Sequence, residues 1–98
     1  MEIDPRQRKA AFNQIRKVLL ESWDPLDVQD LPDAFDEYDT YVPQIFALLA
    51  QGAKEAQLIA YLKDVETRLM GLDEPADDDL QPVARELLAV KAVSVGRT

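Results

Sequence analysis

The acidic residues between positions 23 and 41 have the clearest potential for binding chemistry in this chain. The segment WDPLDVQDLPDAFDEYDTY contains seven acids and no basic residue. Aspartate recurs there at every third position, with leucine and aromatic side chains between the acids. Carboxylates accept hydrogen bonds from lysine and arginine, and they also coordinate hard cations. The segment therefore predicts a binding surface, although it contains no catalytic motif.

A basic protein is the partner that this segment favours. Acids that are close in sequence and lack compensating bases repel each other, and a partner rich in lysine and arginine would relieve that repulsion. Opposite charge would also speed association. We therefore assign partner binding to Asp24, Asp27, Asp36, Glu37 and Asp39, with Tyr38 beside them. The competing interpretation is that the acids only cap helices and keep the chain soluble.

The carboxylates of Asp36, Glu37 and Asp39 allow a second reading, as ligands for Mg²⁺ or Ca²⁺ or as an acid–base pair. Acids at a helix start are common without a metal, however, because the helix dipole favours them there. The chain has no histidine, no cysteine and no glycine-rich loop. Catalytic triads, thiolate zinc sites and phosphate-cradling loops are therefore disfavoured, and we expect no enzyme activity, metal or cofactor.

The aromatic residues of the segment also have two readings. Trp23 would be a partner anchor if exposed, because tryptophan is enriched among interface hot spots. Its helical spacing with Ile15 and Leu19 favours instead the last core residue of the first helix. We expect Tyr41 and Tyr61 to pack in the core with their hydroxyls at the surface, whereas the sequence leaves Tyr38 open.

Composition narrows the classes of partner and location. A net charge of −8 over 98 residues repels phosphate backbones, so nucleic acid is disfavoured. The chain has no long apolar run and no signal-peptide pattern at its start, so we expect no membrane association. The absence of cysteine fits a reducing cytoplasm.

Four amphipathic stretches predict an all-α bundle in a single domain. The spacing of apolar residues predicts antiparallel helices over 5–22, 37–51, 54–70 and 79–92, with a long acidic connector over 24–36. Asp4 is a good N-cap, and Pro43 and Pro82 suit the first turns of their helices. Gly52 and Gly71 fit the left-handed position after a helix. The expected common core is Ile15, Leu19, Ile45, Leu49, Leu62 and Leu69.

Several of these segments resemble the YugE-like family of small bacterial helical proteins. The resemblance is carried by WDPL at 23–26, DEYDTY at 36–41, YL at 61–62 and MGL at 70–72, and it covers roughly residues 12–72. In that family WDP follows the first helix, DEYD opens the second and MGL closes the third. The resemblance implies a compact helical domain in a bacterial cytoplasm. The family has no established activity, so no site residue follows from it.

Four functions remain open at this point. A non-catalytic protein-binding module accounts best for the acids and aromatics together. An immunity or antidote protein that masks a basic toxin is a specialised version of it. The others are a carboxylate-based metal-binding protein or enzyme, and a structural homo-oligomer with the connector as its interface. The chain is expected to be a monomer or a homodimer.

Overall fold

The computed structural model describes residues 5–34 and 36–90, in which helices and turns are joined by irregular segments and no strand occurs. Two of the short helical segments are π turns, η1 and η3, and one is a 3₁₀ turn, η2. The elements in chain order are α1 (Pro5–Val18), η1 (Leu19–Trp23), η2 (Asp39–Tyr41), α2 (Val42–Ala50), α3 (Glu55–Asp64), η3 (Val65–Leu69) and α4 (Asp77–Leu88).

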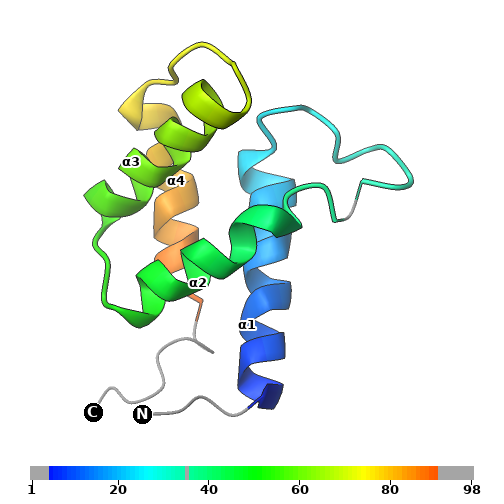
Figure 1. The fold of residues 1–98 in the computed structure, drawn as a ribbon, viewed down its shortest axis with the longest axis vertical. Coiled ribbons are helices and arrows are strands. Elements are labelled where there is room, and N and C mark those ends of the chain that lie inside the picture. Colours follow the sequence, from blue (N-terminus) through cyan, green and yellow to red (C-terminus); the bar gives the residue numbers. More distant parts are fainter. Residues whose placement is uncertain (1–4, 35, 91–98) are drawn as a thin grey trace.

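The four helices form a bundle, as expected. Figure 1 shows α1 and α4 running in opposite directions, with α2 crossing obliquely between α1 and α3. Helix α3 then returns beside α4, also antiparallel to it. The turns between η1 and η2 project on the side of α1 away from α3. None of the helices in residues 5–34 and 36–90 has both the length and the apolar character needed to span a bilayer.

The core lies where the apolar stripes of all four helices meet. Ile15, Leu19, Ile45 and Leu62 are fully buried in one cluster, which confirms that part of the expected core. Leu49 packs against the cluster but is only partly buried. The cluster also takes residues from α4, including Leu80, Val83 and Leu87. Each helix thus depends on the others to bury its apolar face.

The prediction that Leu69 belongs to the core is wrong, since its side chain is 66% exposed. The reason is the π turn η3, in which the Met70 N–H donates to the Val65 carbonyl five residues earlier at 2.9 Å. A π turn holds more residues than an α turn, so the residues after it rotate about the helix axis. Met70 packs against the core cluster instead of Leu69.

The first helix also ends in a π turn, η1. The Asp24 N–H donates to the Leu19 carbonyl at 2.8 Å, and Asp24 itself has a φ of 35° in the left-handed region. Aspartate tolerates that region better than most residues because its short side chain bonds nearby backbone groups. The helical run therefore reaches Trp23, one residue beyond the expected end. The N-cap predicted at Asp4 lies outside the described residues.

Both glycines expected after a helix adopt the left-handed conformation, Gly52 with φ 84° and Gly71 with φ 71°. These values confirm the two predicted helix ends. Pro43 lies in the first turn of α2, also as expected. Pro82 does not lie in a first turn, because α4 begins at Asp77 and Pro82 is inside it. Pro82 lacks the N–H that would bond the Asp78 carbonyl, a group still within the first turn.

Candidate functional site

Asp24 organises the turns that follow the first helix. One carboxylate oxygen accepts hydrogen bonds from the Val28 N–H at 2.9 Å and the Tyr38 hydroxyl at 2.7 Å. The other accepts from the Gln29 N–H at 3.1 Å. Burial would raise the pKa of Asp24, but the hydrogen bonds from Val28, Tyr38 and Gln29 together hold it below its ordinary value. Asp24 therefore holds the connector in place, and its carboxylate is already engaged within the chain.

Tyr38, which the sequence left open, is a core residue with 2% of its surface exposed. Its ring lies 5.3 Å from that of Trp23, and its hydroxyl oxygen accepts the Leu26 N–H at 3.0 Å. Burial, and then the hydrogen bond to Asp24, raise the pKa of Tyr38 well above its ordinary value, so the hydroxyl stays neutral. Its ring is not available to a partner.

Trp23 is likewise buried, at 8% exposure, so the core reading of this residue is correct. Its indole N–H donates to Glu66 Oε2 at 2.7 Å, and Glu66 is also only 8% exposed. This bond joins the π turn that ends the first helix to the π turn that follows α3. Glu66 was not among the predicted site residues, although its spacing of four from Leu62 places it on the apolar stripe of that helix.

Burial is the largest influence on the Glu66 carboxyl, and it raises the pKa of that group above its ordinary value. The Trp23 N–H lowers the pKa in part, and the negative charge of Asp79 raises it again. The charged form is therefore disfavoured in the folded protein compared with the unfolded chain.

A pH-dependent effect on stability follows from this shift. A carboxyl whose folded-state pKa is raised contributes most stability below its unfolded value, about 4.3, and loses it as pH rises through the folded-state value. Glu66→Gln keeps an oxygen acceptor for Trp23 but carries no charge. We expect Glu66→Gln to raise the urea midpoint at pH 7, and the gain to shrink as pH falls through the raised folded-state pKa of Glu66 and to be lost by about pH 4.

The control for this prediction is Glu21→Gln, an exposed acid in the same π turn as Trp23. Because Glu21 is exposed, removal of its charge should change the urea midpoint little at pH 7. A Glu66→Gln midpoint below that of the wild type at pH 7 would contradict the assigned cost of burying the charge.

Asp39 is compensated by a base from another helix. Arg16 Nε donates to Asp39 Oδ1 at 2.8 Å, and Arg16 Nη2 donates to Oδ2 at 2.7 Å, a paired geometry that fixes both side chains. The expectation that all the acids of the segment lack compensating bases is therefore wrong for Asp39. Arg16 lies 23 positions earlier in the chain, so its approach depends on the packing of α1 against α2 and η2.

The remaining acids of the segment face solvent. Asp27, Asp36 and Glu37 are exposed, and Leu26 and Leu31 beside them are 39% and 57% exposed. Within the described ranges, no ion pair joins Asp27, Asp30, Asp33 or Glu37 to a cation. We define the connector surface as Leu26, Asp27, Asp30, Leu31, Asp33, Asp36 and Glu37.

The connector surface is carried by a chain of short turns. Successive i→i+3 backbone bonds link Asp24 to Asp27, Val28 to Leu31, Leu31 to Ala34, and Ala34 to Glu37, with N···O distances of 2.9–3.2 Å. Asp27 adopts a left-handed φ of 56°. Ala34, by contrast, is buried and anchors the middle of the segment. The acids are thus presented on hydrogen-bonded turns that are fastened to the core.

The metal reading finds no matching geometry. In the part of the chain that the structure describes, no three acids lie close enough together to share an ion. Asp39 is engaged by Arg16, so Asp36, Glu37 and Asp39 do not converge on one point.

Compared with family models, with curated proteins and with solved structures, the chain matches none of them.

Proposed function

We propose that this protein is a non-catalytic binding module that docks a basic protein on the connector surface. The observation that carries the proposal is that some acids of the segment are bonded within the chain while others are exposed. Asp24 and Asp39, near the two ends of the segment, are engaged inside the chain. Asp27, Asp36 and Glu37, between them, are exposed to solvent. The site we propose is therefore smaller than the set of residues that the sequence indicated.

Fixed turns favour binding because ordering a loop on association costs free energy. Asp24 and Tyr38 already hold the backbone near Leu26, Val28 and Gln29 through hydrogen bonds. A partner would therefore meet carboxylates whose backbone is already placed. Its lysine and arginine side chains would accelerate association and supply charge-assisted hydrogen bonds.

Two exposed leucines give the connector surface an apolar component. Leu31 is 57% exposed and Leu26 is 39% exposed, and both stand among the acids. Protein interfaces combine an apolar centre with a polar rim, and such a surface fits a partner with apolar side chains among its bases. Charge would then set the association rate, and burial of the leucines would slow dissociation.

The resemblance to the YugE-like family forms part of the same proposal. The WDPL motif lies at the end of the first helix, the DEYDTY motif leads into α2, and the MGL motif follows η3. The positions of WDPL and MGL agree with what the resemblance implies and support this proposal, whereas Asp36 and Glu37 of the DEYDTY motif lie in turns before α2. We also propose a cytoplasmic location, because the chain has no cysteine.

The test compares two triple variants that each remove three negative charges. The first is Asp27→Asn, Asp36→Asn and Glu37→Gln on the connector surface. The control is Glu21→Gln, Asp73→Asn and Asp78→Asn, which are exposed acids elsewhere. Partners are captured from the native host with the wild-type chain, and association rates are then measured for each purified partner.

We expect the connector variant to associate at least about tenfold more slowly than the wild type at low salt, because steering is lost. The difference should narrow at high salt, where charges are screened. The control variant should remain close to the wild type. Equal rates for the two folded triple variants would refute the assignment of the connector surface.

A further inference from the structure

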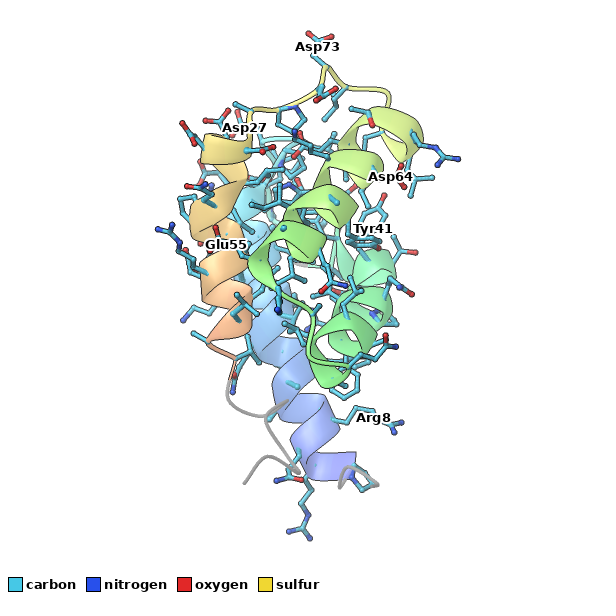
Figure 2. All side chains as sticks on the ribbon, turned by 90° about the vertical axis from the view of Figure 1, so that its left-hand side faces the viewer. Arg8, Asp27, Tyr41, Glu55, Asp64 and Asp73 are labelled. Carbon is cyan, nitrogen blue, oxygen red and sulfur yellow. The ribbon has the colours of Figure 1, made fainter. Side chains whose placement is uncertain are left out.

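A groove of about 400 Å³ lies between α3 and α4, on the face that Figure 2 turns toward the viewer. Its floor is apolar and consists of Ala56, Ile59 and Ala60 from α3. The alanines are exposed and lie one helical turn apart, so another backbone can approach α3 closely there. The proposed function does not use this face.

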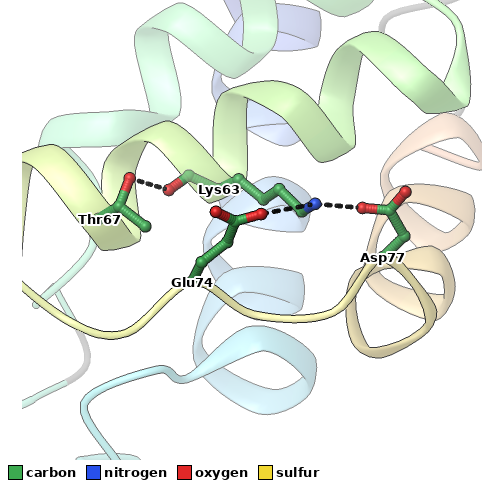
Figure 3. Close-up of polar contacts among 4 residues, drawn as sticks. All are labelled: Lys63, Thr67, Glu74 and Asp77. Carbon is green, nitrogen blue, oxygen red and sulfur yellow. Dashed lines mark hydrogen bonds and ion pairs between the residues drawn. The ribbon is translucent and has the colours of Figure 1, made fainter.

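At each end of the groove, a charged side chain of α3 forms an ion pair with an oppositely charged side chain of α4. At one end, Arg85 Nε donates to Glu55 Oε1 at 3.2 Å. At the other, Lys63 pairs with Asp77 and also reaches Glu74 at 3.4 Å, as Figure 3 shows. Because α3 and α4 are antiparallel, the signs alternate around the four corners: Glu55 negative, Arg85 positive, Asp77 negative and Lys63 positive.

We propose that this groove is the interface of a homodimer, with a second copy of the same chain as its occupant. Two identical surfaces that meet about a two-fold axis must be complementary to themselves. The two-fold axis lies in the plane of the interface and is perpendicular to α3. With this axis, α3 packs antiparallel on the partner's α3, and the alanines of the two helices face each other. Each Glu55 then faces Lys63 of the partner subunit, and each Arg85 faces the partner's Asp77. All four contacts are attractive.

The distribution of charge over the molecule supports the choice of this face. The whole chain carries −8, which opposes self-association, but the four corner charges sum to zero. Figure 1 places the connector on the far side of α1 from α3 and α4, so docking through the groove keeps the acidic connectors of two copies apart. At physiological salt, charges more than about 8 Å apart are largely screened, whereas the corner contacts are short.

The first test is the mass in solution, measured by sedimentation over a series of protein concentrations. The apolar floor is small, and interfaces below about 1,200 Å² are typically weak, so the series runs from about 10 µM to about 1 mM. We expect the mass to rise from the 11.1 kDa of one chain toward twice that value. Ala60→Glu, which places a charged side chain on the floor, should remain monomeric throughout.

The matched control is Ala10→Glu, the same substitution at an exposed helical position on α1. It should dimerise as the wild type does. A wild type that stays monomeric to about 1 mM, or an Ala60→Glu variant that dimerises normally, would overturn the proposal. Binding of a different protein to the groove with no self-association would also overturn it.

A charge exchange tests the arrangement of the two copies without removing any internal ion pair. Glu55→Arg combined with Arg85→Glu keeps the pair within one chain but reverses its order. Like charges then meet at all four contacts of the proposed dimer, and we expect dimerisation to weaken by at least about tenfold. Adding Lys63→Glu and Asp77→Lys reverses the other end as well, with Glu74→Gln included because Glu74 also reaches position 63, and should restore dimerisation.

Unchanged dimerisation of the two-residue exchange, in a chain of normal helicity, would overturn the packing of α3 on the partner's α3. The groove and the connector surface lie on different sides of the molecule. Loss of partner binding in the connector variant would not alter the mass, and a monomeric groove variant should still bind the partner.

Discussion

Truncation of Leu62 to alanine is expected to lower the free energy of unfolding by about 2–5 kcal/mol, which makes it one of the two most damaging changes that we predict. Leu62 is fully buried in the cluster that joins all four helices. Its removal costs the transfer free energy of the missing carbons and leaves a cavity that the helices fill only in part. Urea unfolding followed by circular dichroism measures the loss.

Leu69→Ala is the matched control, because it makes the same change in the adjoining π turn at a side chain that is 66% exposed. Substitutions on the surface usually change stability by less than about 0.5 kcal/mol. We therefore expect Leu69→Ala to resemble the wild type. If Leu62→Ala and Leu69→Ala lower the free energy of unfolding by similar amounts, the π turn does not turn Leu69 out of the core.

Trp23→Ala is the second change with a large expected effect, about 3–5 kcal/mol. The indole packs on the rings of Tyr38 and Tyr41, with centroid distances of 5.3 and 6.1 Å. Its loss also deprives the buried Glu66 carboxylate of the N–H that it accepts. Because Trp23 is the only tryptophan, unfolding must again be followed by circular dichroism.

Two further variants separate packing from hydrogen bonding at this position. Trp23→Phe retains a ring but leaves Glu66 without its donor, which should cost about 1–3 kcal/mol. Adding Glu66→Leu removes the orphaned carboxylate, and we expect it to recover much of that loss. If the double variant is no more stable than Trp23→Phe, the bond between the two π turns does not account for the effect.

The connection between the core and the connector surface has a consequence for function. Trp23 contacts Tyr38, and the Tyr38 hydroxyl bonds both Asp24 and the backbone of Leu26. Core packing therefore sets the path of the turns that carry the exposed acids. Changes at Trp23 or Tyr38 should weaken binding of a basic partner indirectly, through the placement of Asp27 and its neighbours.

Much of the helical framework follows from the sequence alone. Apolar spacing indicated the four helices, because each buries one stripe and exposes the rest. Gly52 and Gly71 marked two helix ends, because glycine enters the left-handed region without a steric penalty. Trp23 could be placed in the core from its spacing with Leu19. All of these inferences depend on residues within a few turns of one another, which is the range over which local sequence acts.

Tertiary structure decided how the polar groups are used. No local pattern pairs Arg16 with Asp39 or Trp23 with Glu66, since these partners lie 23 and 43 positions apart. Those pairings removed Asp39 and the ring of Trp23 from the surface offered to a partner, while Asp27, Asp36 and Glu37 remained exposed. The π turn before Met70 likewise turned Leu69 outward, against its spacing. A carboxylate has the same sequence signature whether it binds inside the chain or faces solvent, and only the packing of distant helices distinguishes the two.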